Sequence, residues 1–175
     1  MYRARELRGP VQTTLIKMRI RPDSPTIDLR AGEKPSGEPV HEEIPVQPLG
    51  GRQFRLLASP TLALGVAAGD QVEMDDQGGY SILRRGSNVV VHVYADEKLD
   101  HASLIVEVNG LGGVLDGRAD APPDAFVSTF TIPSRAGFAQ IEQVFTRYAA
   151  AHPTVRWSYG NVYDARGKPL NWWLK

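Results

Sequence analysis

The fold is decided between residues 88 and 159, where the chain reads NVVVHVY (88–94), VLDGR (114–118), AFVSTFTI (125–132) and VRWSY (155–159). These segments are short and rich in β-branched and aromatic residues, which favour strands. Segment 125–132 has the clearest strand pattern of the whole chain. We therefore expect four strands in this half of the protein.

A helix is expected after the first of these strands. Asp96 is suited to cap its N-terminus, and Gly110 is suited to end it. Its apolar face carries Leu99, Ala102, Ile105 and Val106. The β-branched residues near its end lower the helix propensity of this stretch.

A second helix is expected after the third strand, with Ser134 as its N-cap and Pro153 just beyond its end. Apolar residues recur there at spacings of three and four, at Phe138, Ile141, Phe145 and Tyr148. The resulting order, βαββαβ, is the signature of a ferredoxin-like fold. Such a fold packs two helices on one face of an antiparallel sheet.

The first half of the chain has a different pattern. Six prolines lie between residues 22 and 48. Because proline lacks the amide donor of a central strand, we expect mostly loop there, with a short edge strand at 40–46. Between residues 51 and 86, short β segments alternate with glycine-rich turns, and residues 75–79 form a hairpin loop. This pattern predicts a small barrel-like or curled sheet, to which a strand at 13–20 also belongs.

The fold class expected from these patterns is therefore α+β, a small β-barrel-like N-terminal half followed by a ferredoxin-like half. The predicted parts are a flexible arm (1–12), a β-rich barrel-like subdomain (13–86), a ferredoxin-like subdomain (87–165) and a C-terminal tail (166–175).

The charge balance, the cysteine content and the apolar stretches exclude several classes of function. The 175 residues contain 20 Lys and Arg against 20 Asp and Glu, so the formal net charge is zero, which argues against nucleic acid as the main ligand. No cysteine is present, which excludes disulfides, thiolate metal sites and cysteine nucleophiles. The first ten residues lack a secretory signal, and no stretch is apolar enough to span a membrane. We expect a cytoplasmic protein.

The segments around 48–56, 64–72 and 85–91 (PLGGRQFRL, LGVAAGDQV and RGSNVVV) resemble a bacterial family, the domain-of-unknown-function family 4265. The resemblance extends from about Leu15 to Tyr163 and includes the βαββαβ half. That family has no assigned activity, so the resemblance implies no catalytic residues. It does imply a possible role that has been suspected for such proteins, as immunity partners of bacterial toxins.

No motif predicts an active site. The four histidines lack a metal-binding spacing, no Gly-x-Ser-x-Gly elbow is present, and the glycine-rich loop at 109–113 follows an expected helix rather than preceding one. We therefore expect no catalytic residues, no metal and no cofactor.

Three pairs of residues are the candidates for partner binding. Arg84 and Arg85 can form a local basic patch, and Asp75 and Asp76 stand at a solvated hairpin tip. Trp172 and Trp173, near the chain end, either dock on their own domain or lie exposed for a partner.

These features predict a non-enzymatic protein-binding protein, an immunity protein that binds and occludes a cognate bacterial toxin. The alternative is a nucleic-acid-binding regulatory protein, in which arginines and aromatic residues contact single strands. Oligomeric state is open at this point.

Overall fold

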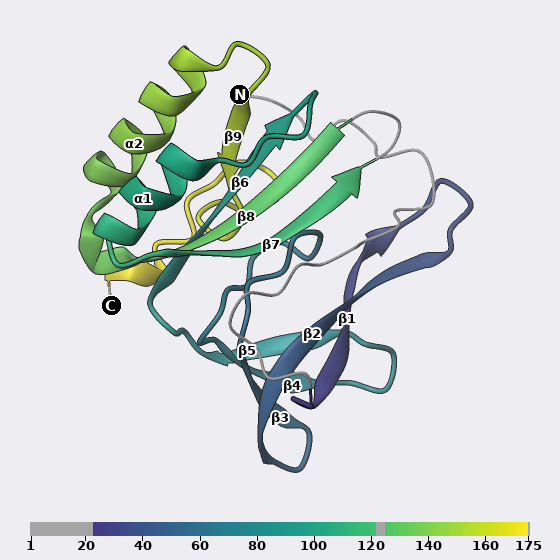
Figure 1. The fold of residues 1–175 in the computed structure, drawn as a ribbon. Helices are drawn as coiled ribbons and strands as arrows, with labels where there is room; N and C mark the ends of the chain where they lie inside the picture. The colour runs from purple at the N-terminus through teal and green to yellow at the C-terminus, as the bar shows by residue number, and fades with distance from the viewer. Residues whose placement is uncertain (1–22, 122–124, 175) are drawn as a thin grey trace.

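The computed structural model describes residues 23–121 and 125–174. This part of the chain is a mixed α+β structure with two antiparallel sheets and two α-helices (Figure 1). The arm expected at 1–12 and the strand expected at 13–20 lie outside the described residues.

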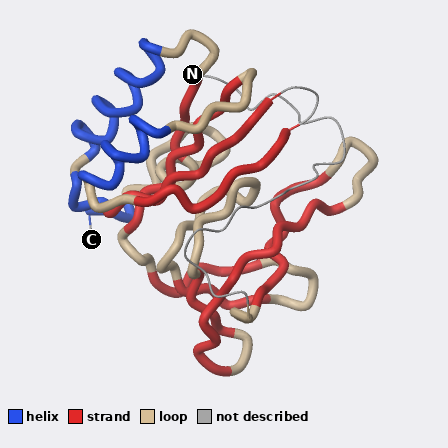
Figure 2. Tube along the Cα trace, in the orientation of Figure 1, coloured by secondary structure: helices blue, strands red, loops and turns tan. Residues whose placement is uncertain are grey.

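The C-terminal half contains β6 (Asn88–Ala95), α1 (Ala102–Gly110), β7 (Val114–Ala121), β8 (Ala125–Pro133), α2 (Phe138–Ala151) and β9 (Arg156–Tyr159). Its four strands form an antiparallel sheet in the order β7-β8-β6-β9. Both helices cover the same face of this sheet (Figures 1 and 2).

Side chains along the two central strands, β6 and β8, point alternately to the two faces of this sheet. Val91 and Phe130 belong to the cluster under the helices, and both are fully buried. His92 and Thr129, their neighbours in sequence, point to the opposite face. Both faces of this sheet are therefore covered, which explains why most residues of β6 and β8 are buried, including the polar Thr129 and Thr131.

Both helices begin later than the sequence predicts. Helix α1 starts at Ala102 after His101, whose left-handed φ of 56° turns the chain, so Asp96 is not its cap. Its buried residues are Leu104 and Val108, whereas Val106 is 70 % exposed. The expected apolar face of α1 is thus right only in part: Leu99 and Ile105 pack against the core cluster, whereas Ala102 and Val106 are exposed.

Helix α2 is preceded by a short 3-10 turn, Ser134–Ala136. Its N-cap is Gly137 at φ 83°, so the prediction that Ser134 caps the helix is wrong. A glycine adopts this backbone conformation at little cost. The change of chain direction at Gly137 therefore sets the start of the helix at Phe138. Within α2 the buried residues are Ile141, Val144, Phe145 and Tyr148.

The N-terminal half contains β1 (Thr26–Glu33), β2 (Pro39–Gly50), β3 (Gln53–Leu56), β4 (Gln71–Met74) and β5 (Tyr80–Arg84). They form a meander in sequence order, and the expected closure into a barrel is absent among the described residues. The sheet curls enough that the β4–β5 turn reaches β1, where Gly78 O accepts a hydrogen bond from Arg30 N at 2.9 Å.

Within the loop expected at 22–48, the described residues instead form a long β ribbon of β1 and β2, which corrects the proline argument. Pro39 is the first residue of β2, and Pro48 adjoins a register shift. Pro45 is the last residue of β2 that pairs with β1, because Val46 already pairs with β3. Each proline therefore occupies a position where a missing amide donor disturbs little of the ladder.

The loop at 57–70 joins the two halves by lying on the face of the four-stranded sheet that the helices leave uncovered. The buried carboxylate of Glu42 accepts hydrogen bonds from the amides of Thr61, Leu62 and Ala63 at 2.7–3.1 Å. Thr61 Oγ1 bonds to Thr129 Oγ1 at 2.8 Å. Buried hydrogen bonds, rather than an apolar cluster, therefore hold the two sheets together here.

Candidate functional site

Two recesses open on the five-stranded sheet. The larger is a shallow groove of about 570 Å³, which we call the hairpin groove; it is lined by Ile27, Asp28, His41, Gly51, Arg52, Phe54, Met74, Asp75, Asp76, Gln77 and Gly78. The smaller is a hollow of about 290 Å³, which we call the arginine hollow; it is lined by Arg55, Gly69, Gln71, Arg84, Arg85, Gly86 and Ser87.

The hairpin groove is shaped by the turn between β4 and β5. Asp75 Oδ1 accepts hydrogen bonds from the amides of Gln77 and Gly79, both at 2.8 Å, which fixes the turn. Gly78 has a φ of 77°, and a Cβ built on it would lie 3.1 Å from Asp28 O and from the His41 ring. The turn therefore packs closely on the β1–β2 ribbon.

The groove combines an apolar floor with a charged rim. Ile27, Phe54 and Met74 belong to the edge of the N-terminal core and are partly exposed. Among the lining residues, three are aspartates and one is Arg52, which forms an exposed ion pair with Asp76. That pairing lowers the pKa of Asp76, chiefly through the hydrogen bond. The groove is thus suited to an apolar side chain with positive charge beside it.

The arginine hollow lies on the outer face of β3, β4 and β5. Strand register places Gln47, Arg55, Gln71 and Arg84 opposite one another across four strands. Phe54 and Met74, one residue out of phase, face the other side and line the hairpin groove. The two recesses are therefore on opposite faces of the same strands.

Bare backbone forms part of the wall of the hollow. A Cβ on Gly86 would lie 2.6 Å from Gly69 Cα and 2.7 Å from Gly69 O, so a side chain there would overlap the neighbouring loop. Gly69 has a φ of 88°, a conformation that favours glycine. Both glycines are required for the two segments to cross at this distance.

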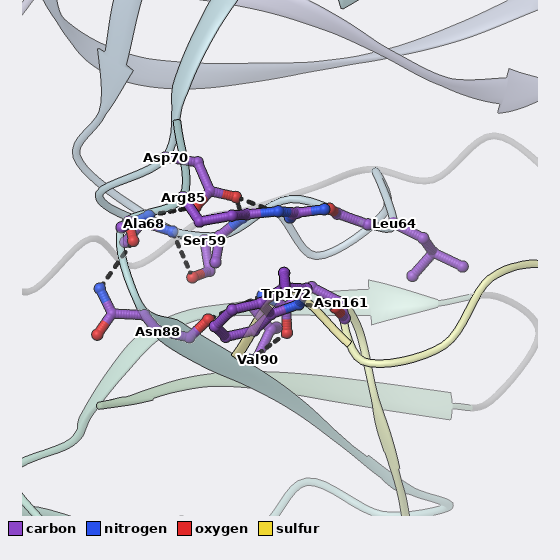
Figure 3. A network of polar contacts seen from close by, with 12 residues as sticks. Ser59, Leu64, Ala68, Asp70, Arg85, Asn88, Val90, Asn161 and Trp172 are labelled. Atoms are coloured by element: carbon purple, nitrogen blue, oxygen red, sulfur yellow. Dashed lines mark hydrogen bonds and ion pairs between the residues drawn. The ribbon is translucent and has the colours of Figure 1, made fainter. Parts of the chain in front are cut away.

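Behind the hollow, Arg85 lies between a buried carboxylate and an indole ring (Figure 3). Its Nη1 donates to Asp70 Oδ2 at 3.1 Å and to Gly65 O at 2.6 Å, and its guanidinium carbon is 5.6 Å from the Trp172 ring centroid. Asp70 is 1 % exposed and also accepts from the amides of Ala67 and Gly86. Burial raises the pKa of Asp70, against the opposing effect of these bonds.

Further hydrogen bonds tie this ion pair to the C-terminal half. Trp172 Nε1 donates to Asn161 O at 2.7 Å, and the side chain of the fully buried Asn161 bonds to Val90 N and Asn88 O. Asn88 Nδ2 in turn donates to Ala68 O at 2.8 Å. We call Asp70, Arg85, Asn88, Asn161 and Trp172 the polar junction (Figure 3).

The six residues expected to bind a partner thus fall into three places. Asp75 and Asp76 line the hairpin groove, whereas Arg84 and Arg85 line the arginine hollow. Trp172 is 8 % exposed and packs in its own core, and Trp173 is half-buried, with its ring centroid 5.0 Å from that of Phe138. Of the two readings of the tryptophans, the structure places them against their own domain.

Sequence reasoning missed the floor of the groove and one arginine of the hollow. Ile27, Phe54 and Met74 come from three strands, and only the register of the curled sheet brings them together. The same holds for Arg55, which is far from Arg84 in sequence. A useful signal was available in Phe54 and Met74, since each is an apolar residue on a short strand rich in polar residues.

A separate histidine cluster lies where α1 begins. His101 Nδ1 is 2.8 Å from Tyr148 OH, and the His152 ring stacks on the Tyr148 ring. Burial, aided by the charge of Arg118, lowers the pKa of His101 to about 4. Burial also lowers the pKa of His92, whose Nε2 is 3.0 Å from Pro60 O. Both imidazoles are therefore neutral at pH 7.

Two further findings concern the described residues as a whole. No group of three or more His, Cys, Asp and Glu side chains in 23–121 and 125–174 is placed to hold a metal ion. Within the same ranges, no helix has the length and apolar character that crossing a membrane requires.

Comparison with known proteins identifies the family. Residues 42–154 match the family described as domain of unknown function (DUF4265), which covers more than half of the chain, so the protein belongs to that family. No curated protein matches the sequence. The fold is similar to a solved structure described as a novel crystal structure of a hypothetical protein from Neisseria gonorrhoeae. The TM-score is 0.57 at 13 % identity, over 81 % of this chain and 96 % of that one.

Proposed function

We propose that this member of the DUF4265 family is a non-enzymatic protein-binding protein, and that it acts as an immunity protein that occludes a cognate bacterial toxin. The observation that carries this proposal is the hairpin groove, an open recess with the apolar floor of Ile27, Phe54 and Met74 and an acidic rim. Apolar contact surrounded by charged groups is the usual anatomy of a protein interface.

The charges of the groove define the partner's chemistry. Three aspartates and one arginine line it, so its formal charge is −2 when the His41 ring is neutral. A partner segment that fits must insert an apolar side chain and place lysine or arginine beside it. A toxin with a basic substrate-binding surface meets this requirement, and occlusion of that surface would stop its activity.

The four-stranded half of the molecule is the scaffold that carries the sheet with the groove. We assign the four-stranded half to the ferredoxin-like class, supported by the strand order β7-β8-β6-β9 and by two helices on one face. A chain without cysteine is compatible with a reducing compartment, and we place its action in the cytoplasm.

The test begins with capture of partners on the tagged full-length chain in its native host. Two groove variants are compared with wild type: Met74→Glu, which puts a charge on the apolar floor, and Asp76→Lys, which reverses the charge of a side chain that is 88 % exposed. The matched control is Val106→Glu on α1, 70 % exposed and outside the groove. Circular dichroism checks that each variant folds.

We expect one stoichiometric protein that wild type and Val106→Glu retain and both groove variants lose. Production of that protein alone should arrest growth, and co-production of the wild-type chain should restore it. Retention by all variants would reject the groove as the binding site. A captured protein that is harmless to growth would reject the immunity role.

A further inference from the structure

The arginine hollow has a charge and a shape that the proposed function does not use. Arg55 and Arg84 contribute two guanidinium groups, and the guanidinium of Arg85, behind the hollow, is compensated by the buried Asp70 carboxylate. Within the described residues, Arg55 bonds only to the neutral side chain of Gln47, at 3.1 Å, and neither Arg55 nor Arg84 has an ion-pair partner. The net formal charge of the hollow and Asp70 together is therefore +2.

The hollow is built rather than incidental. The ion pair with Asp70 and the bond to Gly65 O hold the Arg85 guanidinium in place, while the register across β3, β4 and β5 holds Arg55 and Arg84 on one face. Gln71 lies between these two arginines and supplies an uncharged amide. The carboxylate nearest along β4 on that face belongs to Glu73, which is paired in register with Gln53 and Ser81 and does not line the hollow.

We propose that the arginine hollow is a binding site for a phosphate group, as inorganic phosphate or as the phosphate monoester of a small molecule. A phosphate dianion matches the charge of +2, and its oxygens can accept hydrogen bonds from several guanidinium groups at once. Gly69 and Gly86 line the hollow as well, and their close crossing, which a Cβ on Gly86 would prevent, fixes this part of its wall.

This proposal is independent of the protein-binding role, since the hollow and the hairpin groove lie on opposite faces of β3 and β4. Either can fail while the other stands. A single carboxylate would satisfy fewer of the guanidinium donors, and a nucleic-acid strand would need a basic surface that extends beyond this hollow.

The test is a titration of the isotope-labelled full-length chain, followed by the amide resonances of Gly69, Gly86 and Ser87. The probes are inorganic phosphate, phosphoserine and a single-stranded oligonucleotide without terminal phosphate, each at constant ionic strength. The variants are Arg84→Glu and Arg55→Gln, and the control is Arg135→Glu, in the turn before α2.

We expect saturable shifts confined to these three amides with phosphate and with phosphoserine, at millimolar concentration. Each hollow variant should weaken binding at least tenfold, and Arg135→Glu should leave it unchanged. The absence of saturable shifts, or shifts that persist in Arg84→Glu, would overturn the proposal. Binding of the oligonucleotide without binding of either small probe would overturn it as well, in favour of a nucleic-acid surface.

Discussion

The two sheets of this protein differ in how they are covered. The four-stranded sheet has helices on one face and the loop at 57–70 on the other, and its cluster includes fully buried Phe130, Ile132 and Ile141. The five-stranded sheet encloses a smaller cluster around Leu29, Ile44 and Leu56 and leaves its outer face to solvent. Both recesses occur on this second sheet. The larger core therefore lies in the covered half, and both proposed binding sites lie on the other half.

The largest effect is expected from the core of the covered sheet. Phe130→Ala should lower the free energy of unfolding by about 3–5 kcal/mol, because the ring is fully buried against Phe145, at a centroid distance of 5.6 Å. Val106→Ala, at a 70 % exposed position, should change stability by less than about 0.5 kcal/mol. Denaturant unfolding measures both, and a loss below about 1.5 kcal/mol for Phe130→Ala would contradict this description of the core.

A slightly smaller effect is expected from the polar junction that links the two halves. Asp70→Ala leaves Arg85 without its carboxylate and two backbone amides without their acceptor, at a cost of about 3 kcal/mol. The exposed Asp76 offers the control, since Asp76→Ala should leave stability nearly unchanged. Unfolding curves followed by the fluorescence of Trp157, Trp172 and Trp173 and by circular dichroism should become non-coincident in Asp70→Ala. Coincident, unchanged curves would show that the junction does not couple the halves.

The crossing of the two glycines should be sensitive to a single methyl group. Gly86→Ala places a Cβ against the backbone of Gly69 and should cost about 1–3 kcal/mol. At Gly110, where nothing lies within 4 Å of a built Cβ, the same substitution should be neutral or slightly stabilising. The melting temperatures of Gly86→Ala and Gly110→Ala, measured against wild type, distinguish steric overlap at Gly86 from a general effect of replacing glycine.

The last prediction concerns pH and belongs to the covered half. The pKa of His101 is about 4 in the folded protein, below its ordinary value of 6.5. The unfolded chain therefore binds a proton first as pH falls below 6.5, and folding stability declines by about 1.4 kcal/mol per pH unit down to about pH 4. The lowered pKa of His92 acts in the same direction. Asparagine tolerates the left-handed backbone at position 101 and does not bind this proton. His101→Asn should therefore reduce the slope of stability against pH by the amount that corresponds to about one proton.

The same difference between the halves decided what could be predicted from the sequence. Strand β6 can be predicted because burial on both faces gives a long apolar run, Val89 to Val91, and β8 because it is rich in β-branched and aromatic residues. The starts of α1 and α2 were missed because they depend on the backbone at His101 and Gly137, not on a capping side chain. The proline content predicts a loop in place of β1, and this prediction is wrong because the ribbon accommodates its prolines at its ends and register changes.

The candidate sites could be predicted only in part. The pairs Asp75–Asp76 and Arg84–Arg85 are local in sequence, so composition and turn chemistry identified them. The other residues of the two recesses come from separate strands. Strand register and the curl of an open sheet bring Met74 close to Ile27, and Arg84 close to Arg55. A single sequence does not determine that geometry, since a shift of one residue reverses the faces.

The most direct test of this division is hydrogen exchange of the full-length chain, free and bound to the protein captured through the hairpin groove. We predict increased protection in β1, in β3 and in the β4–β5 hairpin, with α1 and α2 unchanged. Protection concentrated on α1 and α2, with the hairpin at Asp75 and Asp76 unaffected, would contradict it and move the binding surface to the covered half.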